Sequence, residues 1–138
     1  MWLIDGNNVM GAGADGWWRD PASATLRVAE AVAAWVRTGR PGPVTLVFDR
    51  PQDRLTEFAE GDLAIDFATR SGRDAADDRI VVLAEQKFAD HPDLVVVTSD
   101  RGLAARLPPG VRVDGAGGFR RRIGLTAPGR SPGRRTAE

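Results

Sequence analysis

The chain has 138 residues and a formal net charge of zero, and its 42% hydrophobic and 28% charged residues are typical of one globular domain. It has no cysteine and a single histidine, which excludes disulfides and thiolate zinc sites, so any catalysis must come mainly from carboxylates, amides and hydroxyls. The sequence contains neither an apolar run of about 18 residues nor a signal-peptide pattern, and we expect a cytoplasmic protein without a membrane partner.

The first part of the chain predicts a strand, a loop and a long helix. Residues 2–5 (WLID) predict a short apolar strand, and a glycine-rich loop is expected over residues 6–19. A helix is expected to begin after Asp20, because this N-cap acid precedes a proline at the first helical position, and to end at Gly39.

Strands and helices alternate through the rest of the domain. In chain order we expect strands at residues 43–49 (PVTLVFD) and 63–69 (LAIDFAT), a helix at 73–89, a strand at 93–100 (DLVVVTSD), a short helix at 101–107, a strand at 111–115 (VRVDG) and a final helical turn or two at 117–123. Because the strands are apolar almost throughout, this order predicts a mostly parallel sheet of about five strands covered on both faces. The expected fold class is therefore a three-layer α/β domain.

The charge is unevenly distributed along the chain. From Phe119 to Glu138 there are six arginines and one acid, a net charge of +5, which leaves 13 basic and 18 acidic residues, a net charge of −5, in residues 1–118. The Pro, Gly, Ser and Arg composition of residues 124–138 predicts a disordered tail after a domain of residues 1–123. An acidic body beside a basic end suggests a cation-binding surface beside a polyanion-binding one, although a solvated tail explains the charge equally well.

Three of the predicted strands end on an aspartate, namely Asp5, Asp49 and Asp100. In a parallel sheet the carboxyl ends of the strands lie along one edge, where such folds place their sites. A single aspartate after a strand is more often a turn residue. The three together, rather than any one of them, therefore point to a site.

The helix predicted for residues 73–89 adds three more acids, Asp74, Asp77 and Asp78, above the same edge. Favourable contact with the helix dipole is enough to explain Asp74 and Asp78, but Asp77 lies one turn before Val81 and extends the inward apolar stripe. Crowded carboxylates raise one another's pKa unless a cation compensates, and Mg²⁺ or Mn²⁺ prefers oxygen ligands. The combined pattern predicts a metal site that acts on phosphoryl groups.

Five segments occur in a fixed order over residues 1–123: LIDGNNVMGA, VFD, DAAD, VVTSDRGLA and GAGGFRRRI. The set resembles the NYN domain of the PIN-like nuclease superfamily, and in particular its YacP-like branch of ribosome-associated endoribonucleases. The resemblance implies a PIN-like three-layer α/β/α fold, dependence on Mg²⁺ or Mn²⁺, and endonucleolytic cleavage of RNA. It implies RNA as the partner, with ribosome-associated mRNA as one candidate substrate.

The resemblance also assigns residues, position by position. The implied catalytic residues, with the amide orienting the first acid or the attacking water, are Asp5, Asn8, Asp77 and Asp100. The implied metal ligands are Asp5, Asp77 and Asp100, with Asp78 as a weaker one. The residues implied to support them are Asp49, Asp74, Thr98 and Ser99. Two positions depart from the family pattern, with Asn7 where many relatives have an aromatic residue and Asp74 where Glu is common.

We expect hydrolysis of an RNA phosphodiester by a water that attacks phosphorus in line and leaves a 5′-phosphate. Arginines near the site and two tryptophans that could stack on bases are the expected RNA contacts, namely Arg101, Arg120, Arg121, Arg122, Trp17 and Trp18. A hydrophobic lid explains the Trp17-Trp18 pair slightly better, and Trp2 and Trp35 are expected in the core.

Two other functions stay open at this point. A toxin-type PIN ribonuclease would share the acidic site and would arrest growth when expressed without an antitoxin. A non-catalytic adaptor for RNA or the ribosome would keep a degenerate site. A phospho-aspartyl phosphatase is disfavoured, because LIDGNN lacks a second aspartate two residues after the first. The sequence also leaves open a homodimer formed through the exposed tryptophans.

Overall fold

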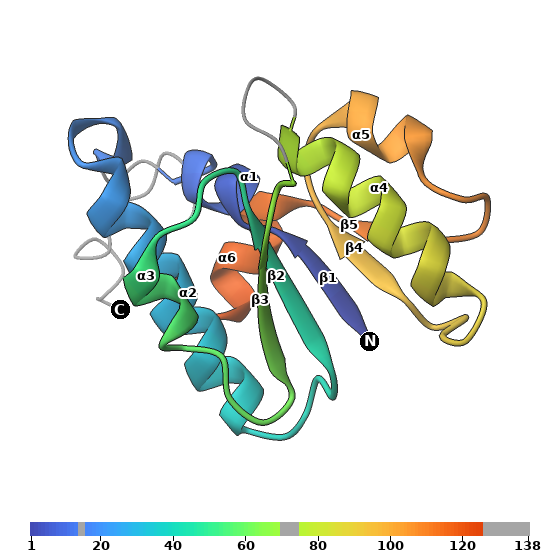
Figure 1. The fold of residues 1–138 in the computed structure, drawn as a ribbon, viewed down its shortest axis with the longest axis horizontal. Helices are drawn as coiled ribbons and strands as arrows, with labels where there is room; N and C mark the ends of the chain where they lie inside the picture. Colours follow the sequence, from blue (N-terminus) through green and yellow to red (C-terminus); the bar gives the residue numbers. More distant parts are fainter. Residues whose placement is uncertain (14–15, 70–74, 126–138) are drawn as a thin grey trace, which may run out of the picture.

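The computed structural model describes residues 1–13, 16–69 and 75–125, and five strands form its central sheet. In chain order they are β1 (Trp2–Asp5), β2 (Val44–Phe48), β3 (Leu63–Phe67), β4 (Val95–Val97) and β5 (Arg112–Asp114). Their order across the sheet is β3-β2-β1-β4-β5, and every pairing is parallel (Figure 1). The predicted parallel sheet is confirmed, with β1 at its centre.

Helices cover both faces of this sheet (Figure 1). They are α1 (Gly6–Gly11), α2 (Pro21–Arg37), α3 (Asp53–Thr56), α4 (Ala75–Phe88), α5 (Arg101–Arg106) and α6 (Ala116–Arg122), with a 3₁₀ turn η1 (Trp17–Arg19) before α2. Within the described ranges, none of them is long and apolar enough to span a membrane. The three-layer α/β/α architecture predicted from the order of elements is confirmed.

Alternation along the strands divides the core into two halves. Ile4 of β1 packs with residues of α2 and α6 in one half, and its neighbour Leu3 packs with residues of α4 and α5 in the other. Leu46 and Val47 of β2 divide in the same way, since successive strand side chains point to opposite faces. By this alternation Asp5 falls on the face that α4 covers.

The structure has a helix, α1, where a glycine-rich loop was predicted. The Asp5 carboxylate caps this helix, because its Oδ1 accepts a hydrogen bond from the backbone N–H of Asn8 at 3.2 Å. Gly6 at the start of α1 packs against β2, and a Cβ there would lie 2.5 Å from Cε1 of Phe48 and 2.8 Å from the carbonyl oxygen of Val47. The glycine therefore permits a close approach rather than a loop.

The long helix α2 forms as predicted. Oδ1 of Asp20 accepts a hydrogen bond from the N–H of Ser23 at 3.2 Å, and Gly39 ends the helix region with a left-handed φ of +78°. The polar segment after β2 contains one further turn, α3, anchored by the buried side chain of Leu55. A single apolar residue carries no periodic signal, so this turn could not be predicted from the pattern.

Parts of two predictions lie outside the described residues. Asp74, predicted as a supporting acid, and the arginines of the predicted tail from residue 126 onward are among them. The structure therefore bears on the site through its other residues.

Candidate active site

Asp5 is the buried acid at the carboxyl end of the central strand, with only 4% of its surface exposed. Its Oδ1 accepts from the backbone N–H of Asn8, and its Oδ2 accepts from Oγ1 of Thr98, both at 3.2 Å. Burial, with a smaller contribution from the negative charges of Asp77 and Asp49, raises the pKa of Asp5 to about 7 despite the lowering effect of the hydrogen bonds from Asn8 and Thr98. Asp5 is therefore an acid that takes up a proton near neutral pH unless a cation lies beside it.

The two asparagines after Asp5 connect β1 to the strands on either side of it. Oδ1 of Asn7 accepts from the backbone N–H of Asp49 at 2.7 Å, at the end of β2. Oδ1 of Asn8 accepts from the backbone N–H of Ser99 at 2.6 Å, beyond the end of β4. The pair of amides thus holds three strand ends in register around Asp5.

The residues after β4 link the acidic edge to α5 and α6. Oγ1 of Thr98 accepts from the backbone N–H of Asp100 at 3.1 Å while it donates to Asp5. Oδ1 of Asp100 caps α5 by accepting from the N–H of Leu103 at 3.1 Å, and Oγ of Ser99 accepts from the N–H of Ala116 at 2.8 Å. Thr98 is therefore the hydroxyl that joins Asp5 to the segment carrying Asp100.

Helix α4 brings a second set of acids to this edge. The half-buried Asp77 in its first turn acts electrostatically on Asp5, as does Asp49, whose Oδ1 accepts from the backbone N–H of Ala76 at 3.3 Å. Asp78, the next residue, instead forms an ion pair with Nη2 of Arg106 in α5 at 2.8 Å. Of the adjacent acids, Asp77 thus belongs to the surroundings of Asp5, and Asp78 faces α5.

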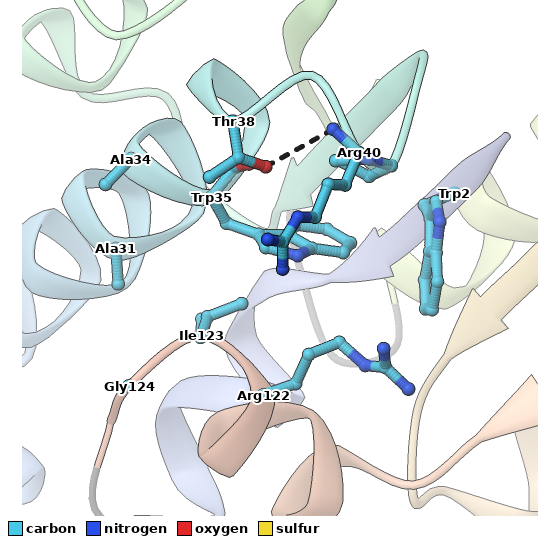
Figure 2. A pocket seen from close by; sticks show the side chains of 10 residues that line it. Trp2, Ala31, Ala34, Trp35, Thr38, Arg40, Arg122, Ile123 and Gly124 are labelled. Carbon is cyan, nitrogen blue, oxygen red and sulfur yellow. Dashed lines mark hydrogen bonds between the residues drawn. The ribbon is translucent and has the colours of Figure 1, made fainter.

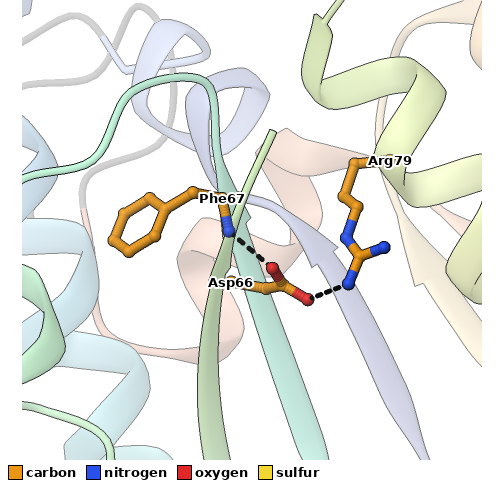
Figure 3. Close-up of polar contacts among 3 residues, drawn as sticks. All are labelled: Asp66, Phe67 and Arg79. Atoms are coloured by element: carbon orange, nitrogen blue, oxygen red, sulfur yellow. Dashed lines mark hydrogen bonds and ion pairs between the residues drawn. The ribbon is translucent and has the colours of Figure 1, made fainter. Parts of the chain in front are cut away.

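An ion pair that was not predicted from the sequence connects the beginning of α4 to the sheet. Nη2 of Arg79 lies 2.9 Å from Oδ2 of Asp66 in β3, and Oδ1 of Asp66 accepts from the backbone N–H of Phe67 at 2.8 Å (Figure 3). Both charged side chains are about three-quarters buried. The only signal in the sequence is the acid Asp66 within the alternating pattern of β3. It indicates that β3 lies at an edge of the sheet, but it does not indicate that Arg79 is the partner of Asp66.

The three consecutive arginines of α6 differ in exposure. Arg121 and Arg122 are exposed, but Arg120 is only 2% exposed and its Nη1 donates to the carbonyl oxygen of Val9 at 3.0 Å. A Cβ at Gly13 would lie 2.5 Å from Nη2 of Arg120, so the guanidinium group packs directly on that backbone. The prediction that Arg120 contacts RNA is therefore wrong, since helical periodicity turns one residue of the run inward.

The tryptophan pair lies beside the N-terminus of α2. Trp17 packs against the core, whereas Trp18 is 57% exposed, and the two rings meet edge to face with centroids 6.0 Å apart. The guanidinium carbon of Arg19 lies 6.0 Å from the Trp18 ring centroid. Trp17 thus covers the core as the predicted lid would, and Trp18 presents a ring to solvent. Arg101, another predicted RNA contact, lies at the start of α5 and is exposed as well.

The acidic site offers only oxygen donors, the ligands that Mg²⁺ and Mn²⁺ prefer. Within residues 1–13, 16–69 and 75–125, no group of three or more His, Asp or Glu side chains is close enough together to hold a metal ion. Mg²⁺ in nucleic-acid enzymes is commonly held by one or two carboxylates together with substrate phosphates and water. The pair of Asp5 and Asp77, whose negative charges repel each other, fits that kind of site.

Comparison with known proteins supports the fold. No protein-family model matches the sequence, and no curated protein matches it. The structure is similar to the crystal structure of a point mutant of Rae1 (YacP) from Bacillus subtilis, with a TM-score of 0.65, 22% sequence identity, and coverage of 88% of this chain and 73% of that one. Such a likeness establishes the fold, and it agrees with the resemblance of the sequence motifs. The chain has the α/β/α fold of Rae1 (YacP).

Proposed function

We propose that this protein is a metal-dependent endoribonuclease that hydrolyses RNA phosphodiester bonds at the carboxyl edge of its sheet. The observation that carries the proposal is the buried Asp5, whose pKa is raised to about 7 by burial and by the charges of two further carboxylates, Asp77 and Asp49. A protein does not gain stability from such crowding, whereas a cation-dependent site requires it. The YacP-like motifs and fold support an RNA substrate, with ribosome-associated mRNA as the more specific form of the proposal.

Asp5 and Asp77 would hold Mg²⁺ or Mn²⁺ together with substrate phosphate and water, and Asp100, which caps α5 beyond the end of β4, is the third acid proposed for the site. When bound, the metal supplies positive charge at the phosphate and lowers the pKa of water. Asp49 supports α4 through its hydrogen bond to Ala76. Asp78 is the weaker candidate ligand in this proposal, because its ion pair with Arg106 already compensates its charge.

The chain's own residues would orient the acid and bind the strand. The hydrogen bonds from Asn8 and Thr98 fix both oxygens of Asp5, so the acid is positioned before substrate arrives. The exposed Arg101 follows Asp100, and the exposed Arg50 follows Asp49, so a cationic side chain flanks the acidic site on each side of β1. These two arginines are suited to binding the phosphates on either side of the bond that is cut.

Cleavage of a mixed single-stranded RNA in Mn²⁺, Mg²⁺ or EDTA tests this function. We expect metal-dependent cutting by the wild type and a loss of at least about 100-fold in Asp77→Asn. The matched control is Asp90→Asn, an exposed acid just beyond the other end of α4, which should cut at the wild-type rate. Cutting that survives both EDTA and Asp77→Asn would contradict the mechanism.

A non-catalytic RNA-binding adaptor is the second candidate function. It is favoured by the fact that the described part of the chain presents no cluster of three metal-ligating side chains. The same assay separates the two functions, because an adaptor would bind the RNA and leave it intact under every metal condition.

A further inference from the structure

A cavity at the amino end of β1 is lined by two tryptophans and two arginines, Trp2, Trp35, Arg40 and Arg122 (Figure 2). Its volume is about 560 Å³, within the range of small-molecule binding pockets. Trp2 begins the strand that Asp5 ends, so the cavity and the acidic site lie at opposite ends of β1. The cavity is therefore no part of the site described above.

The aromatic wall of the cavity is held rigid. The rings of Trp2 and Trp35 meet edge to face with centroids 5.1 Å apart, and each also contacts the buried ring of Phe119, at 6.0 Å and 5.2 Å. Both tryptophans were expected in the core, but they are only partly buried and pack against its edge. Their exposed surface is the part that lines the cavity.

Both arginines bring positive charge into the same space. In Figure 2 the guanidinium group of Arg40 lies in front of the Trp35 ring, and that of Arg122 extends toward Trp2. The guanidinium carbon of Arg122 lies 5.3 Å from the centroid of the Trp2 ring. None of the described residues lining the cavity is acidic, and no ion pair of Arg40 or Arg122 is found within the described ranges.

The helix dipole favours positive side chains near a helix C-terminus, and α2 and α6 both end beside the cavity. This is one physical reason for finding arginines here. That reason applies equally to exposed arginines away from the cavity, such as Arg37 and Arg121. It does not explain why two indole rings form the wall between the cations. Stacking on aromatic rings combined with phosphate binding by arginine is the way that proteins hold unpaired nucleotides.

We propose that this cavity binds an unpaired nucleotide of a single-stranded RNA, its base against the Trp2 and Trp35 rings and its phosphate against Arg40 and Arg122. The chain's own C-terminal segment is a poorer occupant. Residues 126–138 contain three arginines and one glutamate, a net charge of 3 − 1 = +2, which the two arginines repel. An acidic peptide would match the charge but has no base for the indole rings.

Binding of a short fluorescent oligouridylate in EDTA tests the proposal without cleavage. We expect the Arg40→Glu, Arg122→Glu double variant to bind at least about tenfold more weakly than the wild type. The matched control is the Arg37→Glu, Arg54→Glu double variant, which makes the same charge change at exposed arginines outside the cavity and should bind within about twofold of the wild type. Arg40→Gln with Arg122→Gln gives a milder form of the change, and thermal unfolding checks that every variant is folded.

Two competitors test whether a base is required. Inorganic polyphosphate and oligoglutamate, each matched in charge to the oligouridylate, should displace it at least about tenfold less effectively than unlabelled oligouridylate does. RNA binding should also quench tryptophan emission, and the double variant in the cavity should lose most of that quenching. Equal weakening in both double variants, or equal competition by either polyanion, would overturn the proposal.

Discussion

The two ends of β1 differ in almost every physical respect. At the carboxyl end, Asp5 is 4% exposed and caps α1, and the side chains of Asn7 and Asn8 are fixed by hydrogen bonds to the backbone beyond β2 and β4. At the amino end, Trp2 is half-buried and is held by ring contacts beside the exposed Arg40 and Arg122. One end is an ordered cluster of negative charge, and the other is an aromatic cavity with positive charge.

Strand alternation keeps the two ends apart. Trp2 lies on the face that carries Ile4, α2 and α6, whereas Asp5 lies on the opposite face under α4. We therefore expect a change at one end to leave the packing and the local charge of the other end as they are. Substitutions can test each end separately, and those with the largest expected effects are at the acidic end.

Asp5→Asn should separate activity from stability. Cleavage should fall at least about 100-fold, because the acid that would hold the metal is lost. Stability at pH 8 should rise by about 2–4 kcal/mol, since the wild type keeps a buried charge whose pKa is raised to about 7, and the amide can still accept from Asn8 and donate to Thr98. Urea unfolding measures the gain in stability.

The pH dependence of that gain has a definite sign. Below the unfolded-state pKa of about 4 the carboxyl of Asp5 is protonated in both states, so the variant should gain little there. Between about pH 4 and pH 7 only the unfolded wild type ionises, so wild-type stability falls and the variant's advantage grows until it levels off. A loss of stability in Asp5→Asn at pH 8 would contradict the assigned burial cost.

Gly6→Ala should destabilise the acidic end through steric overlap. The added Cβ would lie 2.5 Å from Cε1 of Phe48 and 2.8 Å from the Val47 carbonyl, and a backbone atom cannot move aside like a flexible side chain. We expect a loss of about 1–3 kcal/mol in urea unfolding, with weaker cleavage because Asp5 is the preceding residue. Gly11→Ala at the other end of α1 is the control, since its Cβ would meet nothing nearer than 4.0 Å, and equal losses in both variants would contradict this explanation.

Much of the fold and part of the site could be predicted from the sequence. Nearly continuous apolar strands that end on Asp5, Asp49 and Asp100 predicted a parallel sheet with acids along one edge, because strand direction alone determines where those ends lie. The periodic stripe of α4 also placed Asp77 on its inward side. These features depend on local patterns, which a sequence carries directly.

The features that could not be predicted depend on tertiary contacts, beginning with which strands are neighbours. The hydrogen bonds of Asn7 to β2 and of Asn8 to β4 require the order β2-β1-β4, which no local pattern contains. Helix α1 was predicted as a loop because glycine and asparagine are typical of turns, and tertiary packing of Gly6 on Phe48 overrides that preference. In the same way, a run of three arginines indicates charge but does not indicate which member is buried.

Adjacent arginines of α6 provide a direct comparison of the two ends. Arg120→Gln should cost about 1–3 kcal/mol, because it removes a buried donor from the Val9 carbonyl in α1, whereas Arg122→Gln should change stability by less than about 0.5 kcal/mol. The effects on RNA binding in EDTA should be the reverse, with the larger loss in Arg122→Gln. Thermal unfolding and anisotropy measure the two effects, and similar stability losses in both variants would remove the distinction.

The smallest expected effect concerns the ion pair that holds α4 on β3. Asp66→Asn should cost about 0.5–1 kcal/mol, because Asp66 and Arg79 are only partly exposed, and should lower cleavage a fewfold by loosening the helix that carries Asp77. Asp78→Asn is the matched control: it breaks the more exposed pair with Arg106 on the same helix, so its stability cost should be smaller. RNA binding in EDTA should stay unchanged in both, because neither pair touches the cavity. If Asp66→Asn weakened that binding as much as cleavage, the two ends of β1 would be coupled, and the separation by strand alternation would not hold.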